Sequence, residues 1–224
     1  MLYIVATPIG NIKDITLRAI EVLKNVDLIL CEDTRETKKL LNYYGIKKPL
    51  LSYYREIEKK RVGKVIELLK EGKEIALVCD RGTPGISDPA YILVKEVHKN
   101  NLKVSPIPGP SALTASLSVS GFPLDRVYFY GFLPKREKEK RKIFEKWKNM
   151  DETIVFFESV HRIEKTINLL CEIIPEKEIC ICRELTKIFE EIIKGKIKEV
   201  CEIFKKEKKK GEFVLIIKGG KNGS

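Results

Sequence analysis

Signatures of metal binding and of membrane insertion are absent from this 224-residue sequence. It contains only two histidines, and none of its six cysteines forms a Cys-x-x-Cys pair, so no zinc-ligand spacing occurs and we expect no metal site. No apolar stretch approaches the length of a membrane span, and the apolar residues 1–6 are too few for a signal peptide. We therefore expect a cytoplasmic protein, whose cysteines remain reduced.

The sequence also lacks the loop motifs of several large enzyme classes. The loop after the first apolar run has no Gly-x-Gly-x-x-Gly, so a dinucleotide fingerprint is absent, and no Gly-Lys-Ser/Thr ends a phosphate-binding loop. A Gly-x-Ser-x-Gly nucleophile elbow is missing as well. These absences exclude the commonest interpretations of Gly-rich loops in an α/β chain.

What the sequence does have is a large excess of positive charge. Lys and Arg number 43 against 32 Asp and Glu, which gives a formal net charge of +11. Clustered cations gain free energy when they displace counterions from phosphates, so this excess favours a polyanionic partner. A charged surface that only keeps a protein in solution, or that suits a heat-stable protein, explains the same excess equally well.

Apolar and amphipathic segments alternate through the first half of the chain. Four apolar runs predict buried strands, at residues 2–6, 27–31, 74–79 and 103–107. Three amphipathic stretches predict helices, at residues 15–26, 34–44 and 61–70. Because parallel strands need helical crossovers, we expect an N-terminal α/β domain, residues 1–120, with a mostly parallel sheet and helices on both faces.

A second patterned region follows the turn residues Gly121-Phe122-Pro123. Its predicted strands are residues 127–131, 153–157, 178–183, 189–193 and 213–218. Its predicted helices are residues 137–148, 161–174 and 197–206. Since some neighbouring strands have no helix between them, we expect a C-terminal α/β domain, residues 121–224, with a mixed sheet. The dense charge block at residues 134–142 predicts a solvated loop leading into a helix, or the lip of an RNA site.

Residues suited to ligand binding follow the predicted strands of the first domain. These segments are residues 7–11 (Thr-Pro-Ile-Gly-Asn), 32–35 (Glu-Asp-Thr-Arg), 80–89 (Asp-Arg-Gly-Thr-Pro-Gly-Ile-Ser-Asp-Pro) and 106–112 (Pro-Ile-Pro-Gly-Pro-Ser-Ala). Gly and Pro let the backbone approach a ligand, and Ser, Thr and Asp offer polar groups. One such loop is more often structural. Four at the carboxyl edge of one sheet, where open α/β sheets bind ligands, favour a binding site.

In this order the four segments resemble the tetrapyrrole methylase superfamily, and within it the branch of ribosomal small-subunit 2′-O-methyltransferases. Residues 157–162 (Phe-Glu-Ser-Val-His-Arg), 183–187 (Arg-Glu-Leu-Thr-Lys) and 211–213 (Gly-Glu-Phe) resemble the same branch. The resemblance spans nearly the whole chain. It implies two α/β domains with S-adenosylmethionine (SAM) in the cleft between them, usually in a homodimer. It also implies methylation of a cytidine ribose in the decoding region of small-subunit ribosomal RNA (rRNA), free or in the assembled subunit.

Two departures from the branch are visible. Arg81 stands where its members usually have Ala, and Ala90 where they usually have Gly. Many members also carry a C-terminal helical extension, whereas this sequence stops soon after Gly219-Gly220.

The resemblance also implies which residues contact the ligands. The expected SAM contacts are Pro8, Ile9, Gly10, Thr83, Ser87, Asp88, Ser111, Ala112, Phe157, Arg183 and Phe213. The candidates for binding RNA phosphates are Arg18, Arg35, His161, Arg162 and Lys187.

A ribose hydroxyl is a poor nucleophile until its proton leaves, and a well-placed base adds about 10²–10⁴-fold in rate. Glu32, Asp33 and Glu158 are the carboxylates at strand ends that could accept this proton. For each of them, a structural ion pair with an arginine is the alternative.

Two other functions remain open. A tetrapyrrole (precorrin-type) C-methyltransferase would share the fold and the cofactor, but a flat macrocycle favours an apolar trough over a basic one. A non-catalytic, basic RNA-binding protein would explain the charge but not the four loops at the strand ends.

Overall fold

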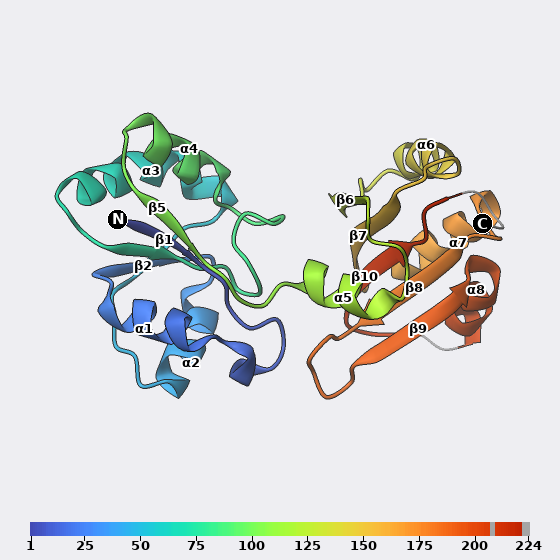
Figure 1. The fold of residues 1–224 in the computed structure, drawn as a ribbon, viewed down its shortest axis with the longest axis horizontal. Coiled ribbons are helices and arrows are strands. Elements are labelled where there is room, and N and C mark those ends of the chain that lie inside the picture. The colour runs from blue at the N-terminus through green and yellow to red at the C-terminus, as the bar shows by residue number, and fades with distance from the viewer. Residues whose placement is uncertain (207–208, 221–224) are drawn as a thin grey trace. The chain divides into compact units, whose positions relative to one another are not determined.

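The computed structural model describes residues 1–206 and 209–220 and divides into two compact units, Met1–Ser111 and Ala112–Ser224 (Figure 1). We expected the second domain to begin at residue 121. Helix α5 (Ala112–Ser120) is instead grouped with the second unit, because it packs against that unit's strand β10 (Glu212–Ile217). Each unit has its own sheet and its own buried core.

The first unit is built on a five-stranded parallel sheet. Its strands are β1 (Leu2–Val5), β2 (Leu28–Cys31), β3 (Leu50–Ser52), β4 (Ile75–Leu77) and β5 (Val104–Ile107). They lie in the order β3-β2-β4-β1-β5, and every neighbouring pair is parallel. The parallel sheet expected from the alternating pattern is therefore confirmed.

Helices cover both faces of this sheet (Figure 1). After the short 3-10 helix η1 (Ile12–Asp14), the helices are α1 (Leu17–Asn25), α2 (Thr34–Tyr43), α3 (Arg55–Lys70) and α4 (Tyr91–Lys99). Helices α1 and α2 bury Leu23 and Leu41 against one face, while α3 and α4 bury Val65 and Leu93 against the other. The hydrophobic effect of these two apolar layers holds the sheet between them.

The loops that leave the neighbouring strands β1 and β4 run to opposite faces of the sheet. The chain passes from β1 to α1 on one face, and from β4 to α4 on the other. A parallel sheet has its topological switch point where adjacent connections diverge in this way, and ligands bind outside the carboxyl ends of the strands at that point. The fold therefore directs attention to the loops after β1 and β4.

The second unit contains a mixed sheet, as predicted. Its strands β6 (Val127–Phe132), β7 (Thr153–Ser159), β8 (Glu178–Arg183), β9 (Glu191–Lys196) and β10 lie in the order β6-β7-β10-β8-β9. Only β6 and β7 are parallel; the remaining pairs are antiparallel.

Three helices, α6 (Glu137–Trp147), α7 (Ile163–Ile173) and α8 (Ile197–Lys206), enclose the core of the second unit with one face of this sheet. The buried rings of Phe144, Trp147 and Phe156 lie at the centre of that core. Across the described ranges 1–206 and 209–220, no helix has the length and apolar character needed to cross a membrane.

Candidate functional site

Thr7 ties the loop after β1 to the loop after β4. Its backbone N–H donates to the carbonyl of Gly82 at 2.8 Å, and the Gly82 N–H donates back to the Thr7 carbonyl at 3.0 Å. The buried Thr7 hydroxyl donates to the carbonyl of Cys79 at 3.0 Å. Because these bonds fix both backbones at the switch point, the two loops form one rigid surface.

The loop after β5 joins the same surface. The Thr83 hydroxyl donates to the Pro110 carbonyl at 3.1 Å. Gly109 lies so close to the end of β1 that a Cβ added there would stand 3.0 Å from the Cβ of Ala6. The structure thus brings together the loops that carry three segments predicted to contact the cofactor, residues 8–10, 83–88 and 110–112.

The loop after β4 is sharply bent. Gly82, Gly85 and Ser87 all have a positive φ, of 83°, 88° and 82°. Glycine tolerates this conformation, but a serine there costs on the order of 1–3 kcal/mol. A strained non-glycine residue persists only where its surroundings hold it. The strain at Ser87 therefore marks this loop as a candidate functional segment.

Three carboxylates crowd the carboxyl ends of β2 and β4. Burial raises the pKa of Asp88 to about 6, and the nearby charge of Asp80 adds to the shift. Burial also raises the pKa of Glu32, assisted by the charges of Asp80 and Asp88. The pKa of Asp80 is raised by burial as well, although its carboxylate accepts the Asp33 N–H at 3.0 Å.

Carboxylates with raised pKa values beside a switch point indicate a functional site, because a cation that approaches them makes each easier to ionise. Asp80 was not predicted to be a site residue, although it lies in the loop of residues 80–89. Within the ranges 1–206 and 209–220, no group of three His, Cys, Asp or Glu side chains is arranged to hold a metal ion.

Asp33 has a different role from its neighbour Glu32. Its side chain caps helix α2 by accepting the Arg35 N–H at 2.8 Å, and it also pairs with the Arg35 guanidinium at 2.7 Å. These hydrogen bonds lower the pKa of Asp33 to about 2. A carboxylate with such a low pKa is a weak base, so the predicted role of Asp33 as proton acceptor does not fit its environment.

Glu158, the third predicted base, is buried within a network of hydrogen bonds and ion pairs. Its Oε1 accepts from the Ser159 N–H and from the Arg162 guanidinium, both at 2.8 Å. Its Oε2 accepts from the Thr166 hydroxyl at 2.7 Å and pairs with Lys140 at 3.4 Å. The side chain has no exposed surface.

Because neither oxygen is exposed, this environment disfavours a role for Glu158 as proton acceptor. The alternative of a structural ion pair with arginine is what the structure shows. Arg162 also donates to the carbonyl of Leu133 at 2.9 Å, so its guanidinium is held within the protein rather than presented for RNA.

The other segments singled out in the second unit lie on adjacent strands. Phe213 on β10 is paired in register with Glu158 on β7 and with Arg183 on β8. Phe157 is half-buried, and its ring contacts those of Phe129 and Phe132. The sheet thus brings three distant parts of the sequence together.

The loop between β8 and β9 is held by ion pairs. Arg183 donates to the carboxylate of Glu191 at 3.0 Å. Lys187 donates to Glu184 and to Glu212, both at 2.9 Å. Lys187 is therefore paired with two carboxylates, which makes it a weaker candidate for phosphate binding than the exposed Arg18 and His161. Arg35 is exposed as well, but it pairs with Asp33.

The two units, one with a parallel and one with a mixed sheet, match a known class of methyltransferases. The model of the tetrapyrrole (corrin/porphyrin) methylases matches residues 1–201. The structure of a cobalt precorrin-4 methyltransferase of cobalamin biosynthesis superposes with a TM-score of 0.68 at 16% identity, covering 97% of this chain and 94% of that one. A uroporphyrin-III C-methyltransferase from Thermus thermophilus gives a TM-score of 0.63 at 16% identity, covering 97% and 93%. At this identity the two structures show the fold alone.

Sequence relatives narrow the class further. The ribosomal RNA small subunit methyltransferase I of Thermotoga maritima is 49% identical over 218 residues, which cover 97% of this chain and 98% of the relative. Its counterpart in Bacillus subtilis is 46% identical over 222 residues, covering 99% and 76%. The chain belongs to the tetrapyrrole methylase family, in its branch of ribosomal RNA small subunit methyltransferases I. It is an enzyme that uses SAM as its methyl donor.

Proposed function

We propose that this enzyme methylates the ribose 2′-hydroxyl of a cytidine in the decoding region of small-subunit rRNA. The observation that carries the proposal is the joined surface at the switch point, where Thr7–Gly82 and Thr83–Pro110 hydrogen bonds fix three loops beside perturbed carboxylates. The relatives named as rRNA methyltransferases, with identities of 46–49%, support an RNA substrate.

SAM is the group that this surface would hold in the first unit. SAM carries positive charge on its sulfonium and its amino group, and the raised pKa of Asp88 means that its carboxylate gains from a nearby cation. Backbone groups at residues 8–10, 83–87 and 110–112 would bind the remainder of the molecule. When bound, SAM supplies the electrophilic methyl group.

Among the three predicted bases, we assign the proton acceptor to Glu32. Its carboxylate is half-buried at the end of β2, and burial and neighbouring carboxylates raise its pKa, so it binds a proton more readily than Asp33. Removing the proton from the ribose hydroxyl creates the nucleophile. The remaining task of the protein is to hold that oxygen in line with the methyl group, about 3–3.5 Å away.

The resemblance to the family supports a proposal for the partners and the oligomeric state. The substrate is either free small-subunit rRNA or the assembled small subunit, and the enzyme acts in the cytoplasm as a homodimer. Size-exclusion chromatography with light scattering tests the dimer, since a dimer has twice the 25.8 kDa mass of the chain.

Labelled SAM distinguishes this function from tetrapyrrole methylation. The purified enzyme is incubated with undermethylated small subunits, with protein-free small-subunit rRNA, and with a uroporphyrinogen. The proposal requires label in one of the two RNA-containing samples and none in the tetrapyrrole. Label in the tetrapyrrole alone would overturn it.

A further inference from the structure

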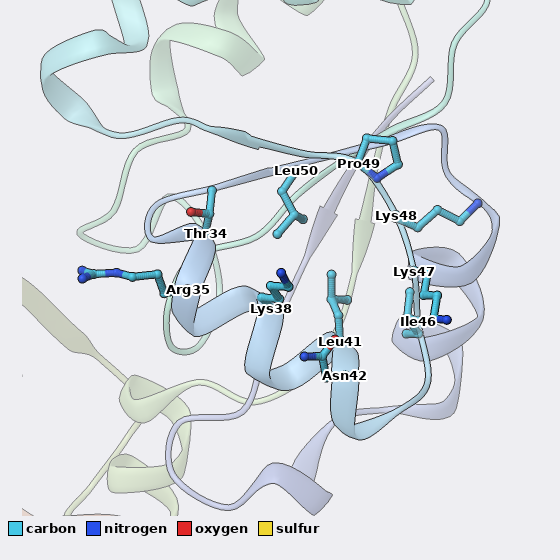
Figure 2. A pocket seen from close by; sticks show the side chains of 10 residues that line it. All are labelled: Thr34, Arg35, Lys38, Leu41, Asn42, Ile46, Lys47, Lys48, Pro49 and Leu50. Carbon is cyan, nitrogen blue, oxygen red and sulfur yellow. The ribbon is translucent and has the colours of Figure 1, made fainter.

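A basic groove lies on the first unit, on the side of the sheet that helix α2 covers. It is a cavity of about 770 Å³ between helix α2 and the segment that leads from it into β3 (Figure 2). Four cations line it, Arg35, Lys38, Lys47 and Lys48. Its lining contains no acidic side chain. We call these four residues and the cavity between them the basic groove.

Among the described residues, the lysines of the basic groove have no close carboxylate partner, although the charge of Lys48 helps to lower the pKa of Asp27. In the part of the chain that the structure describes, Lys38, Lys47 and Lys48 form no salt bridge, whereas Lys39 on the same helix pairs with Glu36 at 2.6 Å. Like charges held around one hollow repel each other, and an anion placed between them removes that repulsion. The electrostatics of the groove therefore favour a bound anion.

The groove is also fixed in shape. Its floor includes Leu41 and Ile46, which are buried in the core of the first unit at 2% and 4% exposure. Gly45, with a φ of 66°, ends helix α2, and the Ile46 N–H then donates to the Leu41 carbonyl at 2.8 Å. This turn holds the backbone that carries Lys47 and Lys48. A preformed site loses less conformational entropy when it binds a ligand.

Its position connects the groove to the candidate active site. The lining begins at Thr34, two residues after Glu32, and continues along the ten residues of α2. A helix of that length spans about 15 Å. Two cations on the first turns of α2 and two on the segment that follows the helix match a chain of phosphates better than a single small anion.

We infer that the basic groove binds the phosphate backbone of the RNA next to the nucleotide that is modified. The inference rests on the proposed function for the identity of the RNA. Phosphate contacts of this kind set the position of the substrate and carry no sequence information. They would hold the target ribose near Glu32 while the strand-end loops hold the cofactor.

The test removes three charges without touching the helix cap. The variant Lys38→Gln/Lys47→Gln/Lys48→Gln is compared with the wild-type enzyme for binding to an unmodified rRNA fragment of the decoding region at several salt concentrations. The plot of log K against log salt has a negative slope, and each lost phosphate contact makes it shallower by about 0.7. For three lost contacts, the slope should become shallower by about 2. Near physiological salt, affinity should fall by roughly tenfold or more.

The matched control removes three exposed lysines from α3 on the opposite face of the sheet, Lys59→Gln/Lys60→Gln/Lys64→Gln. It should keep the wild-type slope, and both triple variants should keep wild-type SAM affinity by calorimetry. An unchanged slope in the groove variant, or an equal loss in the control, would overturn the inference. If RNA binding depends on the groove but no methyl transfer occurs, the groove stands and the proposed function fails.

Discussion

Replacing Asp88 by Asn should raise the free energy of unfolding and weaken the binding of SAM. Burial raises the pKa of this carboxyl from 3.8 to about 6, so at neutral pH the folded protein carries a charge that its surroundings disfavour. Asn keeps an oxygen that can accept the Cys79 thiol and removes the charge. Because SAM is positively charged, the same change removes the favourable partner of the ligand.

The magnitude follows from proton linkage. A shift of about two units at about 1.4 kcal/mol each corresponds to about 3 kcal/mol for a fully buried group. Asp88 is only half-buried, so solvent screening reduces the expected effect to about 1 kcal/mol. Since the folded-state pKa lies above the unfolded one, the cost is absent below pH 4, grows as the pH rises, and is complete above about pH 6.

Urea unfolding of Asp88→Asn and of the wild type between pH 4 and pH 8 measures this directly. The difference in unfolding free energy should rise from near zero at pH 4 to about 1 kcal/mol above pH 6 in favour of the variant. Calorimetry should show SAM affinity reduced by about tenfold or more, the loss expected for one charge-assisted contact.

The exposed Asp125 provides the control, since Asp125→Asn should change neither quantity. A variant at Asp88 that is no more stable at pH 7 than at pH 4, relative to the wild type, would refute the electrostatic reasoning. Unchanged SAM affinity would remove Asp88 from the cofactor site.

Two further substitutions separate catalysis from structure. Glu32→Gln should lower the single-turnover rate of methyl transfer by about 100-fold or more, because the proton acceptor is lost. The free energy of unfolding and the SAM affinity should stay near wild type. A wild-type rate would exclude Glu32 as the base. Glu158→Gln should lower the unfolding free energy by about 3 kcal/mol in urea, because it leaves Lys140 and Arg162 without their carboxylate. A variant that is slow but fully stable would show that the network is not structural.

The sequence predicted those parts of the fold that have a strong local pattern. The apolar, β-branched runs before residues 7, 32, 80 and 108 are bounded by turn residues, so their strands could be recognised. The position of the four loops at one edge of the sheet followed from parallel topology alone. The sequence implied that the ends of these strands are neighbours, but it did not predict the hydrogen bonds of Thr7 and Thr83 that join the loops.

Strand β3 and helices α4 and α5 were missed for physical reasons. Strand β3 has only three residues, all partly exposed, and therefore gives no apolar run. Helix α5 (Ala112–Ser120) alternates small and apolar residues without one apolar face, and its buried positions include the serines Ser116 and Ser120. Helix α4 (Tyr91–Lys99) follows the long loop after β4, where no clear capping residue marks its start.

The role of Glu158 could not be read from its neighbourhood in sequence. Its partners Lys140 and Thr166 come from helices α6 and α7, 18 and 8 residues away in the chain. Lys140 also lies in the charge block at residues 134–142, which predicted a solvated surface, yet its side chain is only 6% exposed. Tertiary packing, rather than local pattern, decides which charges of such a block are buried.

The most direct test of the central claim is to map the methyl group. Undermethylated small subunits are incubated with the enzyme and labelled SAM, and the rRNA is digested and analysed by mass spectrometry. We expect one methyl on the 2′-oxygen of a cytidine in the decoding region, and its loss with Glu32→Gln. A methyl on a base, or on a ribose elsewhere in the subunit, would contradict it.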